Sequence, residues 1–340
     1  MNNGTFEQPN TMNEIYLKLA AGHHLTVTEA EILMKGLCEQ QYSEYQVAFI
    51  LGIYKTRIME VSELTGFRNA LMKLCIPVKL HKPTIDVCGT GGDNKNTFNI
   101  STLSAFVLAA AGVPVAKHGN FAATSVSGSS DILKHFGYNF KTTEQELNDD
   151  LQKDNLCIIH APNFHPALKN VGPVRRGLKT NTLFNLMGPL VNPAQTEYKY
   201  VGVFNRSVAR LYNFFLQNGT SKYTLVNSLD GYDEISLTSD VLVTTNNSEQ
   251  IIPLDELPFK SNTSEDINAG TTIEDAAKIF TAVLRNEATE AQKNVVIVNS
   301  AFAMQCYTGK PLNDCIAACT ESISSGKALQ LFTRVIANGR

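Results

Sequence analysis

The stretch TIDVCGTGGDNKNTFNIS, residues 84–101, decides the fold class, because a strand-like run meets a helix-like run across a glycine-rich turn. Residues 84–88 are mostly apolar or β-prone, and the helix-like run STLSAFVLAAAG begins at Ser101. The turn between them contains GTGGD, residues 89–93. Glycines let the backbone approach an anion, and the free N–H groups at a helix start point toward it. The stretch therefore predicts a phosphate-binding loop in an α/β domain.

The loop matches neither of the two familiar phosphate-binding patterns. It lacks the G-x4-G-K-[ST] spacing of a P-loop, and Asn94 stands where the dinucleotide fingerprint requires glycine. Asp93 inside the loop would repel a polyphosphate unless a hydroxyl or a metal lay between them. The loop thus favours a phosphorylated sugar bound with Mg²⁺. The alternative is a tight strand-to-helix turn in which Asp93 only caps the helix.

A second segment, VAKHGNFAATSVSGSSDIL at residues 115–133, also runs from a strand through a loop of small and polar residues into a helix. Lys117 and His118 end a strand-like run, and Gly119 and Asn120 form a turn before a hydroxyl-rich stretch. Backbone N–H groups, hydroxyls and one ammonium group suit a multiply charged anion. The alternative is a solvated loop of serine and glycine. Two such loops, each after a strand, favour the anion-binding interpretation.

The chain before the first loop is helical in pattern. Residues 12–76 contain MNEIYLKLAAG, TEAEILMKGLC, EYQVAFILGIYKT and VSELTGFRNALMKL, with apolar residues at three- and four-residue spacing. Candidate N-caps are Thr28, Ser43 and Ser62, and Gly22 is a plausible stop. We therefore expect an N-terminal helical domain over residues 1–80.

Beyond residue 83 the pattern alternates between strands and helices. The strand-like runs are TIDVCG, VPVAKHG, NLCIIH, YKYVGVF and YTLVNS, with helix-like runs between them. Helical stretches at about 272–287 and 311–336 close the chain. This alternation predicts an α/β domain over residues 81–340, with a mainly parallel central sheet flanked by helices.

Composition narrows the functional class. The 340 residues are 43% hydrophobic and 18% charged, with a net charge of −3 and no Lys/Arg-dense run, which argues against a nucleic-acid partner. No apolar run is long enough to span a bilayer, and the first ten residues do not resemble a secretory signal. Seven scattered cysteines predict a reduced, cytoplasmic protein. Cys315 and Cys319 have no further ligand nearby in sequence, so we do not expect a metal there.

Seven sequence blocks resemble the anthranilate phosphoribosyltransferase family of tryptophan biosynthesis, in that family's order and near its spacing. They are GTGGD at 89–93, TFNIST at 97–102, KHGN at 117–120, GSSD at 128–131, HAPNFHPALKNVGPVRR at 160–176, FNLMGPLVNPA at 184–194 and DGYDEISL at 230–237. The helical pattern of residues 12–76 also matches. The resemblance therefore covers nearly the whole chain.

The resemblance implies an activity and an architecture. The 5-phosphoribosyl group of phosphoribosyl pyrophosphate (PRPP) would pass to the amine of anthranilate, giving N-(5-phosphoribosyl)anthranilate and pyrophosphate, with Mg²⁺ required. The family fold is a helical domain plus an α/β domain, and a segment near 165–190 returns to the helical domain. A homodimer through the helical domains is also implied.

The resemblance assigns site residues by their positions in the blocks. The PRPP contacts would be Gly89, Gly92, Asp93, Thr97, Asn99, Ser101, Thr102, Lys117, His118, Gly119, Asn120, Thr124, Ser125 and Ser129. The anthranilate contacts would be Gly89, Asn120, His165 and Arg175. Mg²⁺ would bind Ser101 at one site and Asp233 with Glu234 at another.

Three of these roles have simpler alternatives. His118 is a candidate acceptor of the amine proton, but His118 and His165 are equally explained by packing or hydrogen bonding. Asp233 and Glu234 would, without the resemblance, be a solvated acidic loop. A planar guanidinium at Arg175 suits a carboxylate on a flat ring.

The chain also departs from the family's commonest pattern. Phe121 replaces an arginine after KHGN, Asn94 replaces a frequent glycine, and Asn181 stands where arginine is frequent. The segment VNSLDGYDE lacks the usual His-Gly before its acidic pair. These departures bear on acceptor affinity and specificity.

Three other functions remain open from sequence. A pyrimidine nucleoside phosphorylase of the same fold would use inorganic phosphate and lack the Mg²⁺-binding acids. A non-catalytic nucleic-acid-binding relative would have lost GTGGD and gained a basic face. The same transfer to a different aromatic amine would leave the donor site unchanged.

Overall fold

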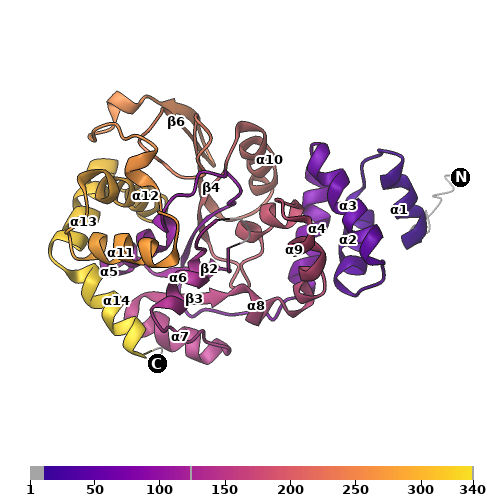
Figure 1. Ribbon diagram of the computed structural model, residues 1–340, viewed down its shortest axis with the longest axis horizontal. Coiled ribbons are helices and arrows are strands. Elements are labelled where there is room, and N and C mark those ends of the chain that lie inside the picture. The colour runs from indigo at the N-terminus through magenta and orange to yellow at the C-terminus, as the bar shows by residue number, and fades with distance from the viewer. Residues whose placement is uncertain (1–10, 123–124, 339–340) are drawn as a thin grey trace, which may run out of the picture. The chain divides into compact units, whose positions relative to one another are not determined.

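The computed structural model describes residues 11–122 and 125–338. The chain divides into two compact units, Met1–Ile76 with His165–Met187, and Pro77–Phe164 with Gly188–Arg340 (Figure 1). We call them the helical unit and the α/β unit and describe each by itself.

The helical unit consists of helices from two separate parts of the chain. Residues 12–76, predicted to be helical, form α1 (Met12–Ala20), α2 (Val27–Cys38), α3 (Glu44–Thr56) and α4 (Val61–Leu74). The later segment adds η1 (Pro166–Lys169), α9 (Gly172–Leu178) and η2 (Leu183–Leu186). Asn170 joins the two parts, because its side-chain amide donates to the carbonyl of Cys38 at 2.6 Å.

The helix starts follow capping boxes rather than the nearest serine or threonine. Ser43 caps α3 as predicted. The predictions of Thr28 and Ser62 as caps are wrong, because α2 begins after Thr26 and α4 after Glu60. Thr26 and Glu29 form a capping box, in which each side chain accepts a hydrogen bond from the backbone N–H of the other residue. The Ser62 hydroxyl does not cap a helix and instead donates to the Leu25 carbonyl at 2.8 Å.

A fully buried carboxylate holds the helical unit together. Glu63 accepts hydrogen bonds from the Leu25 N–H at 3.1 Å, the Tyr54 hydroxyl at 3.0 Å and the Glu60 N–H at 2.9 Å. The Arg57 guanidinium donates to both carboxylate oxygens, at 2.9 and 2.5 Å. Burial by itself raises the pKa of Glu63, but these hydrogen bonds outweigh it and hold the pKa below its usual range.

The α/β unit is built on a seven-stranded sheet within the described residues, in the order β3-β2-β1-β4-β5-β6-β7. Its strands are β1 (Ile85–Gly89), β2 (Val115–Gly119), β3 (Leu156–His160), β4 (Tyr198–Gly202), β5 (Lys222–Ser228), β6 (Val241–Thr245) and β7 (Glu249–Ile252). The first five strands are parallel, which confirms the predicted fold class. The antiparallel strands β6 and β7 were not predicted.

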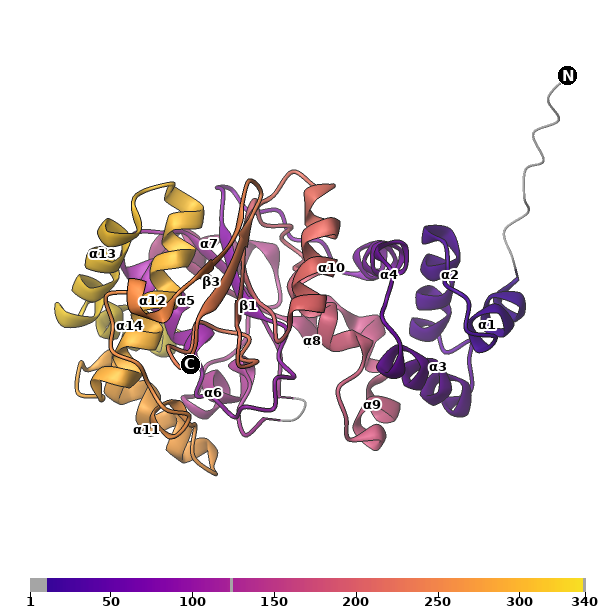
Figure 2. The same ribbon diagram turned by 90° about the horizontal axis from the view of Figure 1, so that it is seen from above.

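Helices cover both faces of this sheet (Figure 2). On β3, Leu156 and Ile158 join the larger core, whereas Cys157 and Ile159 pack with α7 (Glu144–Asp154) on the opposite face. The larger core contains α5 (Ile100–Ala110), α6 (Ser129–His135), α11 (Ile273–Leu284), α12 (Glu290–Thr308), α13 (Leu312–Ser324) and α14 (Lys327–Asn338). The remaining elements are α7 (Glu144–Asp154), α8 (Ala161–Phe164), η3 (Gly188–Leu190), α10 (Arg206–Gln217), η4 (Leu254–Glu256) and η5 (Glu265–Ile267).

The C-terminal helices differ from the sequence prediction in two ways. The predicted helix over 311–336 is two helices, α13 and α14, which Gly326 separates at φ +76°. The 19-residue helix α12 was not predicted. Its residues from Val295 to Met304 are all buried, so it has no polar face to give a helical period, and VVIV within it is typical of a strand.

The segment that leaves α4 packs with the α/β unit. Val78 belongs to the same apolar cluster as Leu147 and Leu151 of α7, and its N–H donates to the Pro193 carbonyl at 3.2 Å. The division between the units therefore falls at Ile76 and Pro77. The sequence had placed it at residues 80 and 81. No helix in the part of the chain that the structure describes is long and apolar enough to cross a bilayer.

Candidate active site

The predicted phosphate-binding loops leave the carboxyl ends of neighbouring strands. β1 pairs with β2 on one side and with β4 on the other, so the strand order reverses at β1. In open α/β sheets, the loops on either side of such a reversal diverge and leave a crevice where ligands bind. The GTGGD loop follows β1 and the KHGN loop ends β2. The topology therefore brings both loops to one edge of the sheet.

The first loop is held in a conformation that favours glycine and asparagine. Gly91 and Gly92 have φ of +62° and +84°, and Asn94 and Asn96 have φ of +58° and +53°. The Asn96 carbonyl accepts from the Ala269 N–H at 2.9 Å, which anchors the far end of the loop. Asn94, the departure from the family's glycine, thus adopts a left-handed conformation that asparagine tolerates.

The acidic pair lies against this loop. Asp233 Oδ2 accepts a hydrogen bond from the Gly91 N–H at 2.6 Å. A Cβ on Gly89 would overlap the Asp233 carboxylate, and a Cβ on Gly202 would overlap the Asp233 carbonyl oxygen. Gly89, predicted only as a substrate contact, therefore has a packing reason to be glycine. Gly202 was missed by sequence reasoning, because nothing in YKYVGVF marks it as facing residue 233.

The carboxylate of Asp93 acts on both members of the acidic pair, Asp233 and Glu234. Burial, then Asp93, raises the pKa of Asp233 well above its usual value and that of Glu234 to about 8. Hydrogen bonding by Thr97 and the Ser101 backbone opposes the rise at Glu234. The structure therefore brings both members of the acidic pair together with four predicted residues of the first loop, which are Gly89, Asp93, Thr97 and Ser101.

Two oxygens in this acidic group are buried without a hydrogen-bond partner, Asp93 Oδ2 and Glu234 Oε2. Buried polar atoms are normally paired, so orphaned carboxylate oxygens fit a cation that the structure does not contain. Carboxylates and a serine hydroxyl are oxygen ligands of the kind that Mg²⁺ takes. No cluster of three or more His, Cys, Asp or Glu side chains that could hold a metal ion occurs among the described residues.

Lys117 is an internal cation rather than a surface one. Its side chain is 1% exposed, and Nζ donates to the Val87 carbonyl at 2.6 Å and to Ser101 Oγ at 3.4 Å. Lys117 also acts to lower the pKa of Glu234. The lysine thus reaches from β2 to β1 and to the start of α5.

A buried carboxylate beneath the loops was missed by sequence reasoning. Asp86 of β1 accepts from the His118 N–H at 3.1 Å and from the Asn192 side-chain amide at 2.9 Å. Asn192 also donates to the Ala116 carbonyl at 2.9 Å. Asp86 and Asn192 therefore fix the end of β2, where Lys117 and His118 lie. A single acid within a strand-like run carries no signal of this role.

His118 is a neutral ring at physiological pH. Burial lowers its pKa to about 4. Its Nδ1 lies 3.0 Å from the Gly188 carbonyl, which selects the tautomer with the proton on Nδ1. The acceptor lone pair then belongs to Nε2.

The second loop is organised by hydrogen bonds to its own backbone. Asp131 Oδ2 accepts from the Ala122 N–H at 2.7 Å and the Gly128 N–H at 2.9 Å. The Asn120 carbonyl accepts from the Ser130 N–H at 3.1 Å. A Cβ on Gly119 would overlap Ser129 Oγ, which accounts for that glycine.

The remaining predicted residues of the two loops differ in exposure and in hydrogen bonding. Ser125 is exposed, and Thr124 lies outside the described residues. Asn99 Nδ2 donates to the Ser127 carbonyl at 3.1 Å, and the Ser127 hydroxyl donates to Asn99 Oδ1 at 3.2 Å. Ser127, which belongs to the predicted hydroxyl-rich stretch but not to the predicted PRPP contacts, therefore joins the second loop to the start of α5. Thr102 is buried on α5, and its hydroxyl oxygen has no hydrogen-bond partner.

Phe121, where the resemblance leads one to expect arginine, packs on an aromatic pair. Its ring meets the ring of His160 edge to face at a centroid distance of 5.0 Å, and His160 stacks on Phe140 at 4.1 Å. Ser130 Oγ lies 2.8 Å from His160 Nδ1. The Phe121 ring remains 41% exposed, so an apolar surface replaces a charge beside the phosphate loop.

Arg175 and His165 belong to the helical unit, whereas the loops belong to the α/β unit. The Arg175 guanidinium lies over the Phe184 ring at 5.0 Å, and burial lowers its pKa. Among the described residues it forms no ion pair within 4.0 Å. His165 is buried. The grouping of these two residues with the loops stays a prediction.

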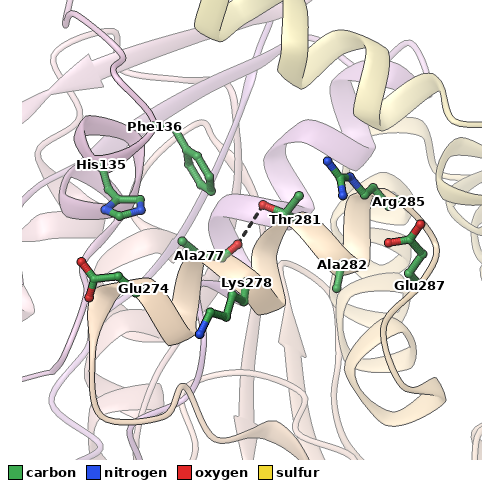
Figure 3. A pocket seen from close by; sticks show the side chains of 9 residues that line it. All are labelled: His135, Phe136, Glu274, Ala277, Lys278, Thr281, Ala282, Arg285 and Glu287. Carbon is green, nitrogen blue, oxygen red and sulfur yellow. Dashed lines mark hydrogen bonds between the residues drawn. The ribbon is translucent and has the colours of Figure 1, made fainter.

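A cavity of about 460 Å³ lies elsewhere in the α/β unit, between the end of α6 and α11 (Figure 3). Its lining residues are His135, Phe136, Glu274, Ala277, Lys278, Thr281, Ala282, Arg285 and Glu287. None of the residues predicted to bind substrate or metal is among them. The cavity is therefore separate from the candidate site.

Two family models match the two parts of the chain. Residues 13–75 match the helical bundle domain of a glycosyl transferase family, and residues 81–329 match the a/b domain of a glycosyl transferase family. Together they cover most of the chain.

Relatives and solved structures agree with these matches. The anthranilate phosphoribosyltransferase of Bacteroides thetaiotaomicron is 44% identical over 96% of this chain and 98% of its own, and that of Cytophaga hutchinsonii is 43% identical over 96% and 100%. The Thermus thermophilus anthranilate phosphoribosyltransferase structure aligns with a TM-score of 0.88 at 29% identity, over 96% of this chain and 99% of that one. The Saccharomyces cerevisiae enzyme in complex with PRPP and Mg aligns with a TM-score of 0.86 at 22% identity, over 96% and 97%, and shows the fold. Since identity above 40% extends over nearly the full length of both chains, this chain belongs to the anthranilate phosphoribosyltransferase family.

Proposed function

We propose that the protein transfers the 5-phosphoribosyl group from PRPP to the amine of anthranilate, in tryptophan biosynthesis. The observation that carries this function is 44% identity, over 96% of the chain, to a relative of that name. The site agrees with it, because two glycine-rich loops and an acidic pair meet at the reversal of strand order. The products are N-(5-phosphoribosyl)anthranilate and pyrophosphate.

The two loops bind PRPP in this proposal. Backbone N–H groups of the first loop and of the start of α5 face the phosphate oxygens, and the second loop encloses them. The contacts are those predicted from the resemblance, Gly89, Gly92, Asp93, Thr97, Asn99, Ser101, Thr102, Lys117, His118, Gly119, Asn120, Thr124, Ser125 and Ser129. The network around Lys117, Ser101 and Asn99 supports this grouping. Such preorganised donors stabilise charge on the departing pyrophosphate without reorganisation.

Mg²⁺ is the cofactor, with Ser101 at one position and the Asp233–Glu234 pair at another. The orphaned oxygens of Asp93 and Glu234 support an oxygen-coordinated cation here. When bound, the ion neutralises charge on the pyrophosphate. The residues of this chain hold the acids in place and keep water from the ribose.

The acceptor lies against Arg175, His165, Asn120 and Gly89. Arg175 carries a guanidinium without a carboxylate partner among the described residues, and a planar carboxylate on a flat ring matches its geometry. The aromatic amine is already an unprotonated nucleophile at neutral pH, so positioning supplies most of the catalysis. His118, neutral with its lone pair on Nε2, is the group we assign to accept the amine proton late in the reaction.

The protein works in the cytoplasm as a homodimer formed through its helical unit. An exposed apolar surface supports the dimer: Tyr45 and Phe49 of α3 and Leu17 of α1 are 89%, 47% and 55% exposed. The Tyr16 ring packs on Phe49 at 5.9 Å, so this surface is continuous from α1 to α3. All seven cysteines are free.

The proposal is tested by the loss of anthranilate fluorescence with purified protein, with and without PRPP and with and without Mg²⁺. We expect loss of fluorescence only when both are present. PRPP binding without anthranilate consumption would support transfer to a different aromatic amine. Phosphorolysis of a pyrimidine nucleoside, or salt-dependent binding of DNA, would support one of the other two functions instead.

A further inference from the structure

A buried asparagine on α12 uses all of its hydrogen-bonding capacity, half of it on the residue that follows Glu234. Asn299 is 1% exposed, and its Oδ1 accepts from the Tyr200 hydroxyl at 2.7 Å and from the Ile235 N–H at 3.0 Å. Its Nδ2 donates to the Ile235 carbonyl at 2.9 Å and to the Val295 carbonyl at 2.7 Å. Both backbone groups of Ile235, the residue after Glu234, are therefore held by one side chain.

A second side chain holds the same segment from the sheet. The hydroxyl of Ser228, the last residue of β5, donates to the Glu234 carbonyl at 2.7 Å. It accepts from the Ser236 N–H at 3.1 Å. The backbone from Glu234 to Ser236 is thus fixed on two sides, by α12 and by β5. We call Asn299 and Ser228 together the bracket.

The segment depends on side chains for hydrogen-bond partners, because it is not part of a strand or a helix. Residues 229–240, which contain Asp233 and Glu234, lie between β5 and β6 and form neither a helix nor a strand. Without a strand ladder, their backbone N–H and carbonyl groups depend on side chains for partners. The bracket supplies those partners next to the acids.

Packing by itself does not account for an asparagine at this position. Its neighbours along α12, from Val295 to Met304, are all buried and mostly apolar. A leucine of similar size would fill the space, whereas a buried amide is unfavourable unless each of its polar atoms is paired. All four pairings are present, and two of them go to the residue beside Glu234. The Asn299 amide therefore stabilises the loop of residues 229–240 rather than the packing of the core.

We propose that Asn299 and Ser228 are positioning residues that hold the carboxylates of Asp233 and Glu234 in place for a divalent cation. The proposal rests on the assignment of these acids as the Mg²⁺ ligands in the proposed function. The bracket touches neither substrate nor metal. It acts on the acids through the backbone, since preorganised ligands bind without a further ordering cost.

The test is Mn²⁺ binding to the full-length protein in the presence of PRPP, followed by electron paramagnetic resonance, for Asn299→Leu, Asn299→Ser and Ser228→Ala. We expect Mn²⁺ affinity to fall at least tenfold in the Asn299 variants and at least threefold in Ser228→Ala. The Mg²⁺ concentration that half-saturates anthranilate consumption should rise in parallel. The KM for anthranilate at saturating Mg²⁺ should change less than twofold.

Ser300→Ala is the matched control. Ser300 is the next residue on α12 and is equally buried, but its hydroxyl donates to the Val296 carbonyl of the same helix, at 2.7 Å. This variant should bind Mn²⁺ as the wild type does. A purely structural role for Asn299 would lower the melting temperature and leave Mn²⁺ affinity intact, and that result in any folded bracket variant would overturn the proposal.

Failure of the proposed function gives a different result. If the wild type binds Mn²⁺ with PRPP but does not consume anthranilate, the function fails and the bracket is still tested by the Mn²⁺ titration. If the wild type binds no Mn²⁺, the assignment of the acids fails and the bracket proposal fails with it. If the Asn299 variants do not fold, unchanged Mn²⁺ affinity in Ser228→Ala is sufficient to overturn the proposal.

Discussion

Gly202, the last residue of β4, lies so close to the carbonyl oxygen of Asp233 that a Cβ would overlap it. Strand end and acidic loop are therefore in direct backbone contact. Gly202→Ala must displace the backbone of either β4 or Asp233, because the overlap is with a backbone atom and no side-chain rotation can relieve it. We expect a loss of about 1–3 kcal/mol in unfolding free energy and a higher Mg²⁺ requirement. Urea unfolding and a Mg²⁺ titration of activity measure the two effects.

Gly52→Ala is the control for that substitution. Gly52 is exposed within α3, and a Cβ there would meet nothing within 4 Å. Alanine should stabilise the helical unit by about 0.5–1 kcal/mol, because glycine loses more conformational freedom in a helix. Equal destabilisation by both substitutions would contradict the contact between Gly202 and Asp233.

The acidic pair should determine the Mg²⁺ requirement. In Asp233→Asn with Glu234→Gln, the amides keep the shape of the side chains but cannot ionise to bind a cation. The Mg²⁺ concentration for half-maximal activity should rise at least tenfold, which corresponds to about 1.4 kcal/mol. Glu265→Gln, on the exposed carboxylate of η5, is the matched control. A Mg²⁺ titration that is unchanged in the double variant excludes these acids as ligands.

Arg175→Ala should weaken the capture of anthranilate. The lost charge-assisted pair is worth roughly 2–5 kcal/mol, which is on the order of tens- to thousands-fold in kcat/KM at about 1.4 kcal/mol per factor of ten. Its neighbour Arg176 is exposed, and Arg176→Ala should change kcat/KM little. Steady-state kinetics with anthranilate as the varied substrate decide the matter, and a loss below threefold in Arg175→Ala removes this residue from the site.

Glu63 should make the stability of the helical unit depend on pH. Its pKa is held below the usual value in the folded protein, so the ionised form contributes stability above the unfolded-state pKa of about 4.3. That contribution is lost as the pH falls through the lower, folded-state pKa. Glu63→Gln removes one partner of a buried ion pair and should cost about 3 kcal/mol at neutral pH.

The difference between wild type and Glu63→Gln should shrink as the pH falls below about 4. Hydrogen exchange of the α2 and α4 amides reports on this unit separately from the α/β unit. Lys73→Met, which removes an exposed ion pair with Glu31, is the control and should have an effect within about 0.5 kcal/mol. A constant difference between the Glu63→Gln and wild-type stabilities across the pH range would count against the network.

Short-range patterns were sufficient for much of this protein. The first five strands, the helical region over residues 12–76 and the two phosphate-type loops follow from apolar periodicity and from glycine placement. These features are local, because a strand, a helix or a tight turn is specified by residues close together in the chain. Ser43 as a cap and Gly22, at φ +84° just after the end of α1, as a helix stop belong to the same class.

Features that depend on burial from several directions were not predictable in this way. Helix α12 is buried on every side from Val295 to Met304 and so lacks a helical period, and strands β6 and β7 are a short hairpin attached to a parallel sheet. Thr28 and Ser62 were plausible caps from sequence. In the structure Thr26 caps α2 instead, and the Ser62 hydroxyl donates to the Leu25 carbonyl.

The sequence by itself determined the fold class, the family and the order of the loops that meet at the site, because these depend on local composition and motif spacing. Only the tertiary structure decided which residues support those loops. Gly202, Asp86 and Asn299 act on partners 31, 106 and 64 residues away or on adjacent strands, through packing and hydrogen bonds. Such contacts exist only once the sheet has brought distant segments together, and no spacing in the chain encodes them.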